Sequence, residues 1–106
     1  MQENSVKMVV TDLDDTVWRG LIGEQDASEL HIEGWPVGYI EALALLRQRG
    51  ILLAIISKNA HEVVVSKWDA AVGGRLSLSD FVAKKINWNS KVENMLEILR
   101  ETNLLE

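Results

Sequence analysis

Val9-Val10-Thr11-Asp12-Leu13-Asp14-Asp15-Thr16 sets the interpretation of the whole chain. The apolar run that begins at Val6, with a single lysine in it, is typical of a buried strand, and it stops at three acids. Acids at the carboxyl end of a parallel strand cost stability but are well placed for chemistry, because ligands bind at that edge of open α/β sheets. Asp12 and Asp14 are next-but-one neighbours, so an extended chain would present both on one face. A solvated turn after the strand is the alternative, since Asp and Thr are common in turns.

The composition indicates one small globular domain over residues 1–106. Of the 106 residues, 47% are hydrophobic and 25% are charged, as in soluble folded proteins. The net charge of -5 argues against a nucleic-acid binder, because such proteins are usually basic. The absence of cysteine excludes disulfides and cysteine-bound metals, and no apolar run reaches the roughly 18 residues of a membrane helix. Met1-Gln2-Glu3-Asn4 is unlike a basic secretory signal, so we expect a cytoplasmic protein that binds neither nucleic acid nor membrane.

The residues that follow the acids predict a βαβ unit. A helical pattern covers about 37–48, and Gly50 is a good helix stop. Six apolar residues, 51–56, then predict a central parallel strand that is buried on both faces. The crossover between the two strands should be right-handed, which brings their carboxyl ends to the same edge of the sheet. Asp12 and Ser57, far apart in the sequence, are therefore expected to lie side by side.

The second half of the chain predicts two more helices and a weaker strand. Asn59, with Glu62 three residues later, resembles a capping box for a helix over about 60–71. A third strand over 81–86 is interrupted by two lysines. Ser90-Lys91-Val92-Glu93 opens the last helix with a second capping box. The helical spacing of its apolar residues predicts a buried stripe made of Val92, Met95, Leu96 and Leu99.

Between the first strand and the first helix, the pattern is less regular. Residues 17–23 and 30–32 could form the two arms of a small hairpin. All four tryptophans are expected to be buried at least in part, and Trp18 and Trp88 could also border a pocket. Lys67 is expected to be solvated.

Four chemical groups converge on the carboxyl edge of the predicted sheet. Asp12 and Asp14 follow the first strand, and Ser57 follows the second, beside the free N–H groups at the start of a helix. Lys91 lies in the first turn of the last helix, where a cation opposes the helix dipole, so its presence indicates an anion nearby. Simple capping by Ser57 and Asn59, and a solvated Lys91, are the alternatives on local grounds.

Together these groups favour phosphoryl chemistry with Mg²⁺. This cation prefers carboxylate oxygens and substrate phosphate oxygens, with several waters retained. One carboxylate could attack phosphorus to form an aspartyl-phosphate, and the second could protonate the leaving oxygen and then deprotonate a water. Lys91 and Ser57 would stabilise the charge of the transferred phosphoryl group.

The acids after an apolar strand, Ser57 after the second strand and Lys91 resemble the first three motifs of the haloacid dehalogenase-like (HAD) superfamily. More narrowly, the chain resembles the FkbH-like branch in five blocks that span nearly its whole length: Asp12-Leu13-Asp14-Asp15-Thr16-Val17-Trp18, Gly20-Leu21-Ile22-Gly23-Glu24, Arg49-Gly50-Ile51, Ser57-Lys58-Asn59 and Asn87-Trp88-Asn89-Ser90-Lys91. The resemblance implies a fold of the α/β class, a three-layer α/β/α Rossmann-like core with a parallel sheet. About three strands and three helices of it would be present, without a cap domain.

The resemblance also implies a role for each motif residue. Asp12 would be the nucleophile and Asp14 the acid/base. The carboxylate of Asp12 and the main-chain carbonyl of Asp14 would bind Mg²⁺. Ser57 and Lys91 would bind phosphate. The residues expected to support the substrate side of the site are Thr16, Lys58 and Asn59.

The chain departs from the family at the fourth motif, an acidic pair that follows the next strand and completes the Mg²⁺ site. No such pair occurs before Glu106, so we expect a truncated core. In the family's sheet order the next strand would lie beside the first one. The first strand would then have an open edge, which invites pairing with another chain.

The short gaps between motifs imply an open site, because neither gap could hold a cap domain of usual size. An open site suits a large or carrier-bound phosphorylated substrate. FkbH-like proteins are linked to transfer of a glyceryl group from a phosphorylated three-carbon donor to an acyl carrier protein in polyketide-type pathways. Two alternatives are a non-catalytic interaction module that docks through its open sheet edge and a phosphoacceptor like those of response regulators.

Overall fold

The computed structural model describes residues 6–26, 30 and 32–103. In chain order the strands and helices are β1 (Met8–Thr11), α1 (Trp35–Gln48), β2 (Leu52–Ser57), α2 (His61–Val72), β3 (Ala83–Ile86) and α3 (Lys91–Glu101). Two short 3-10 turns, Gly73–Arg75 and Leu78–Asp80, lie between α2 and β3. The three strands form one parallel sheet in the order β1-β2-β3, which confirms the predicted α/β class.

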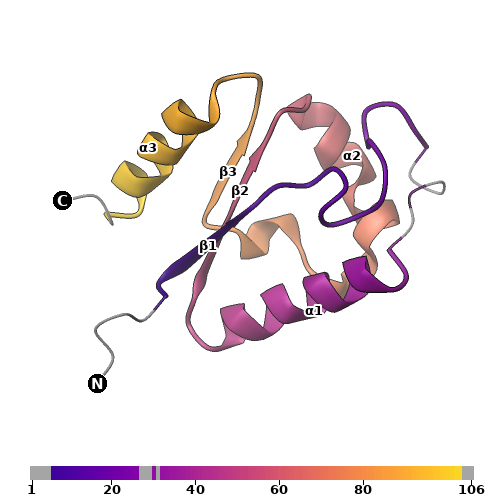
Figure 1. Cartoon of the computed structure of the whole chain (residues 1–106), viewed down its shortest axis with the longest axis horizontal. Coiled ribbons are helices and arrows are strands. Elements are labelled where there is room, and N and C mark those ends of the chain that lie inside the picture. Colours follow the sequence, from indigo (N-terminus) through magenta and orange to yellow (C-terminus); the bar gives the residue numbers. More distant parts are fainter. Residues whose placement is uncertain (1–5, 27–29, 31, 104–106) are drawn as a thin grey trace.

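The sheet is the middle of three layers. Helices α1 and α2 cover one face, and α3 covers the other (Figure 1). Along β2, Leu53 and Ile55 face the α1 and α2 side, whereas Ala54 and Ile56 face α3. This alternation explains why the strand is an uninterrupted apolar run, since both of its faces are buried.

The element boundaries differ from the predicted ones by one or two residues at most places. Helix α1 begins at Trp35, with Pro36 in its first turn, where the missing N–H costs nothing. Gly50 lies in the short connection between α1 and β2, and its φ of 89° is a conformation that favours glycine. Among the described residues, no helix is long and apolar enough to cross a membrane.

Over the first arm of the predicted hairpin, residues 17–23, the described residues contain no continuous strand, and the hairpin as a whole stays a prediction. Residues 15–17 form a turn, Trp18 is bridged to Asp14, and Arg19 is also a bridge residue. His31, in the second arm, lies outside the described residues. The turn forms because the N–H groups of Thr16 and Val17 both donate to the carbonyl of Leu13.

The predicted buried stripe of α3 is wrong for Val92 and Leu96, whereas Met95 and Leu99 are half-buried and Met95 packs against the core. Asn94 and Ile98 are buried, whereas Val92 and Leu96 are 69% and 38% exposed. Residues two apart on a helix lie about 200° apart around its axis, so burial of the 94 and 98 row turns the 92 and 96 row outward. The alanines that β2 and β3 present under α3 leave room for Ile98.

The expectation that all four tryptophans are at least partly buried holds for two of them. Trp18 and Trp68 are buried, and their rings meet edge to face with centroids 5.9 Å apart. Trp35 and Trp88 are 52% and 70% exposed. The guanidinium of Arg19 lies over the ring of Trp35, 5.8 Å from its centroid, and so covers part of that ring.

Candidate active site

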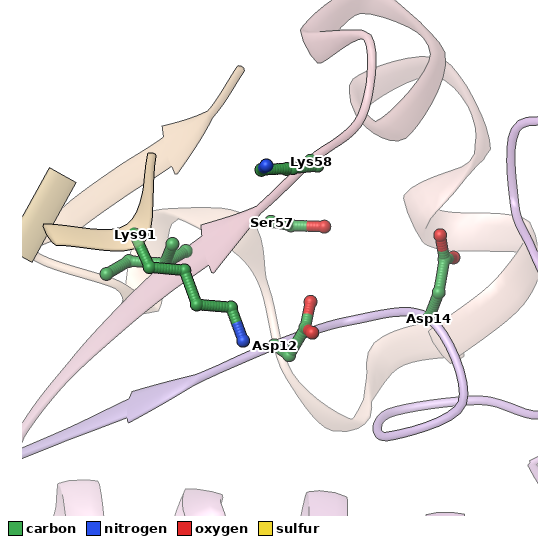
Figure 2. A pocket seen from close by; sticks show the side chains of 6 residues that line it. Asp12, Asp14, Ser57, Lys58 and Lys91 are labelled. Atoms are coloured by element: carbon green, nitrogen blue, oxygen red, sulfur yellow. The ribbon is translucent and has the colours of Figure 1, made fainter. Parts of the chain in front are cut away.

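The carboxyl ends of the strands surround a small hollow of about 170 Å³. Its lining residues come from the loop after β1, the end of β2 and the start of α3, and they are Asp12, Asp14, Ile56, Ser57, Lys58 and Lys91. Figure 2 shows the side chain of Ser57 above the carboxylate of Asp12, with the Lys91 side chain extending toward Asp12. The βαβ topology therefore brings together the residues that the sequence placed at this edge.

Asp12 is exposed, at the mouth of the hollow. Its Oδ1 atom accepts a hydrogen bond of 2.7 Å from the backbone N–H of Leu13. Its main-chain carbonyl accepts one from Thr11 Oγ1, and the Tyr39 hydroxyl lies 2.7 Å from the same Thr11 oxygen. The backbone of Asp12 is thus tied to α1, while Oδ2 accepts no hydrogen bond within residues 6–26, 30 and 32–103.

The carboxylate of Asp14 is held by three donors. Its Oδ1 accepts from Trp18 Nε1 and from the backbone N–H of Ile22, both at 3.0 Å. Its Oδ2 accepts from Asn59 Nδ2, also at 3.0 Å. Figure 2 shows the Asp14 carboxylate set apart from that of Asp12. Both carboxylates nevertheless line the same hollow, as the spacing of the two acids in the sequence predicted.

Asn59 joins the ends of the first two strands. The predicted capping box at Asn59 is wrong, since the N-cap residue of α2 is Ala60 and it makes no side-chain cap bond. The buried amide of Asn59 instead donates to Ser57 Oγ at 2.9 Å and to Asp14 Oδ2. Ser57 is itself buried and is the last residue of β2. Asn59 therefore sets the position of Asp14 relative to the Ser57 hydroxyl.

Lys91 is the first residue of α3, and the loop before it is well fixed. The predicted capping box is confirmed: Ser90 Oγ accepts from the N–H of Glu93, and Glu93 accepts from the N–H of Ser90. The side-chain amides of Asn87 and Asn94 donate to one another, and the N–H of Asn87 donates to the carbonyl of Ser57. These bonds tie the start of α3 to the end of β2.

The remaining predicted residues fall in different places. Lys58 lines the hollow and its side chain is exposed. Thr16 is half-buried in the turn after β1 and lines no hollow at this edge. The direct contacts expected of Thr16, Lys58 and Asn59 with a substrate stay predictions.

The site fits Mg²⁺ through the chemistry of its donors. Within the part of the chain that the structure describes, no three His, Cys, Asp or Glu side chains lie close enough to hold a metal on their own. Mg²⁺ is nevertheless often held by one or two carboxylates together with waters and substrate phosphate oxygens. Asp12, with Oδ2 available beside the hollow, offers a ligand of this type.

Sequence reasoning missed the groups that hold the loop after β1. Lys67, expected to be solvated, donates from Nζ to the carbonyls of Ile22 and Gln25 at 2.9 and 2.8 Å. Trp18 was expected near a pocket, but its bond to Asp14 was not foreseen. The signal that could have predicted this bond is the spacing of Asp14 and Trp18, which are four residues apart across a tight turn.

Comparisons with known proteins give one informative match. No protein-family model and no curated protein matches the chain. Among solved structures, it is similar to the crystal structure of the N-terminal part of the protein BF1531 from Bacteroides fragilis, which contains a phosphatase domain complexed with Mg. The TM-score is 0.84 and the sequence identity 27%, over 92% of this chain and 28% of that one. The likeness supports a HAD-like fold for this chain, which spans little more than a quarter of its structural neighbour.

Proposed function

We propose that the protein is a Mg²⁺-dependent phosphatase or phosphoryl-transfer domain that acts through an aspartyl-phosphate. One observation carries the proposal: Asp12, Ser57 and Lys91 line one hollow at the carboxyl edge of a parallel sheet. The similar chain from Bacteroides fragilis, which contains a phosphatase domain complexed with Mg, supports the same conclusion.

In the proposed first step, a carboxylate oxygen of Asp12 attacks phosphorus, and the bond from phosphorus to the ester oxygen breaks. Asp14 gives a proton to that leaving oxygen. A water then attacks the phosphorus of the aspartyl-phosphate, the bond to Asp12 breaks, and the proton of the water returns to Asp14. Ser57 and Lys91 would bind the phosphoryl oxygens throughout.

Mg²⁺, when bound, would neutralise charge on the phosphoryl oxygens. The carboxylate of Asp12 and the main-chain carbonyl of Asp14 would hold it. The carboxylate of Asp14 would stay out of this ligand set, which agrees with its three hydrogen bonds to Trp18, Ile22 and Asn59.

A narrower function rests on the FkbH-like resemblance alone. It is transfer of a glyceryl group from a phosphorylated donor to an acyl carrier protein. The site is open enough for a carrier-bound group, because Asp12, Lys58 and Lys91 are all exposed.

The substitution Asp12→Asn tests the general proposal. Turnover of an aryl phosphate in the presence of Mg²⁺ should fall by at least about a thousandfold, because the amide is a poor nucleophile. The matched control is Asp15→Asn, the same chemical change at an exposed acid next to the site. Asn tolerates the φ of 56° at this position and keeps the oxygen that accepts from the N–H of Gly20. Wild-type turnover by the Asp12 variant would disprove the proposal.

A second candidate is a non-catalytic module that associates with a second copy of itself through β1. Among the described residues, β1 pairs only with β2, and Val6, two residues before the strand, is 60% exposed. Unpaired strand edges with apolar surroundings favour strand addition. Light scattering at several concentrations tests this candidate: a discrete dimer supports it, and a monomer throughout contradicts it.

A further inference from the structure

A second hollow, of about 400 Å³, adjoins the first one and shares Asp14 and Lys58 with it. Its other lining residues come from the loop after β1, the start of α2 and the loop after β3; they are Leu21, Gly23, Glu24, Asn59, Ala60, Val63 and Trp88. Because Asp14 lies in the wall of both hollows, a molecule that fills both would place its central atoms next to this carboxylate.

The wall of the second hollow is mostly apolar, and two of its large side chains are unusually exposed. Trp88 is 70% exposed and Leu21 is 40% exposed, whereas Trp18 and Trp68 are buried. Large apolar side chains that stay exposed in the wall of one hollow commonly mark a binding site. The ring of Trp88 offers a flat face to a ligand.

Both side chains are mounted on fixed backbone. The N–H of Leu21 donates to Gln25 Oε1, and Lys67 binds the carbonyl of the next residue, Ile22. On the other side, the amide pair of Asn87 and Asn94 fixes the residue before Trp88. The apolar wall is therefore built before any ligand arrives, which lowers the entropic cost of binding.

The charges around the two hollows differ. The first hollow holds two cations, Lys58 and Lys91, opposite its acids. In the second, the single cation Lys58 faces two acids, Asp14 and Glu24, and no second cation lines it within the described residues. A second phosphate or carboxylate would find little net attraction there, whereas an uncharged apolar group would contact Leu21, Val63 and Trp88.

We propose that the second hollow is the leaving-group subsite of the phosphatase, and that the substrate is a phosphate monoester with an uncharged apolar or aromatic leaving group. The phosphoryl group would occupy the first hollow and the leaving group the second, with the bridging oxygen beside Asp14. This inference rests on the proposed phosphatase function, because it needs the first hollow to bind phosphate, and it is an alternative to the narrower glyceryl-transfer function, whose donor is polar.

The test compares two non-hydrolysable probes by calorimetry in the presence of Mg²⁺. In benzylphosphonate, a methylene replaces the bridging oxygen of an aryl ester; 3-hydroxypropylphosphonate has the same phosphonate on a polar arm. The full chain should bind benzylphosphonate about tenfold more tightly, which corresponds to about 1.4 kcal/mol. Trp88→Ala should bring the two affinities within about twofold and leave that of the polar probe unchanged. Trp35→Ala is the matched control, since Trp35 is an exposed tryptophan that lines neither hollow.

Lys91→Ala separates the subsite from the phosphate site, because it should weaken both probes by the same factor. If the wild-type chain binds the two probes equally, or the polar probe more tightly, the leaving-group subsite is disproved while the phosphate site stands. If Trp88→Ala leaves the preference intact, the subsite is also disproved. If neither probe binds the wild-type chain, the proposed function fails, and the inference fails with it.

Discussion

On the side of the sheet covered by α1 and α2, three aromatic rings interlock, with Trp68 edge to face against both Trp18 and Phe81. On the side covered by α3, the buried cluster among the described residues holds only Ala54, Ile56, Ala83 and Ile98, with Met8, Val10 and Met95 partly buried against it. The loop that carries Asp12 and Asp14 is anchored in the first, thicker core through Trp18 and its neighbours. Lys91 begins the helix that lies over the thinner one. The two sides of the site thus depend on cores of very different size.

The largest effect is expected for Trp68→Ala, which removes the centre of the thicker core. The side chain is buried, and its Nε1 donates to the carbonyl of Leu76 at 2.8 Å. Truncation of a buried tryptophan costs about 3–5 kcal/mol, and the carbonyl loses its partner as well. Urea denaturation monitored by circular dichroism measures the loss. A loss below about 1 kcal/mol would show that the thicker core does not depend on this ring.

A smaller effect is expected for Ile98→Ala, the corresponding change in the thinner core. Ile98 is fully buried, but two of its neighbours are Ala54 and Ala83. We expect a loss of about 2 kcal/mol, at the lower end of the range for such truncations. Hydrogen exchange should show faster opening of α3 than of α2. Equal acceleration in both helices would mean that the two cores unfold as one unit.

The position of the site could be predicted from the sequence because it follows from topology. A strand that ends in acids, an apolar central strand and a right-handed crossover suffice to bring Asp12 next to Ser57. The similar phosphatase domain confirms the fold class. The roles assigned to these residues stay predictions, because neither the fold nor the geometry measures chemistry.

The details that could not be predicted depend on side-chain direction in irregular segments. The sequence around Asn59 is typical of a helix cap, yet its side chain donates to Asp14 and Ser57. It does so because the loop after β1 and the loop after β2 meet at the carboxyl edge of the sheet. Lys67 matches a solvated lysine, yet two carbonyls of a folded-back loop surround its amine. The buried row of α3 was missed because periodicity finds apolar residues, whereas this helix buries Asn94.

The loop of residues 20–26, which lines the second hollow, is expected to loosen in Lys67→Met. This change removes two hydrogen bonds from a charged donor to the carbonyls of Ile22 and Gln25, and keeps most of the apolar stem. A loss of about 1–2 kcal/mol is expected, since the amine is only half-buried. Limited proteolysis should cut the loop near residues 20–26 faster. The control Lys7→Met, at an exposed position, should change stability by less than about 0.5 kcal/mol.

The smallest effect is expected for Lys85→Met, which removes the ion pairs that join β3 to α3. Lys85 Nζ lies 2.6 Å from Glu101 and 3.1 Å from Glu97. The pKa of Lys85 is raised above its ordinary value of 10.5, mainly by the hydrogen bond to Glu101. Burial lowers the pKa, and the weaker hydrogen bond to Glu97 raises it further. Both carboxylates are about half exposed, so water screens them and the loss at neutral pH should be below about 1 kcal/mol.

Because the pKa of Lys85 is raised in the folded state, the stability that it adds is fully present below pH 10.5, its unfolded value. That stability is lost as the pH rises through the higher folded value. The difference in unfolding free energy between the wild-type protein and Lys85→Met should therefore be constant from neutral pH to about 10 and should shrink above 10.5. If this difference in unfolding free energy instead grew above pH 10.5, the ion pairs of Lys85 would not be what holds α3 to β3. Salt screens exposed ion pairs, so concentrated sodium chloride should remove the small stability that Lys85 adds to the wild-type protein. The stability of the thicker core, which is apolar, should not fall with salt in this way.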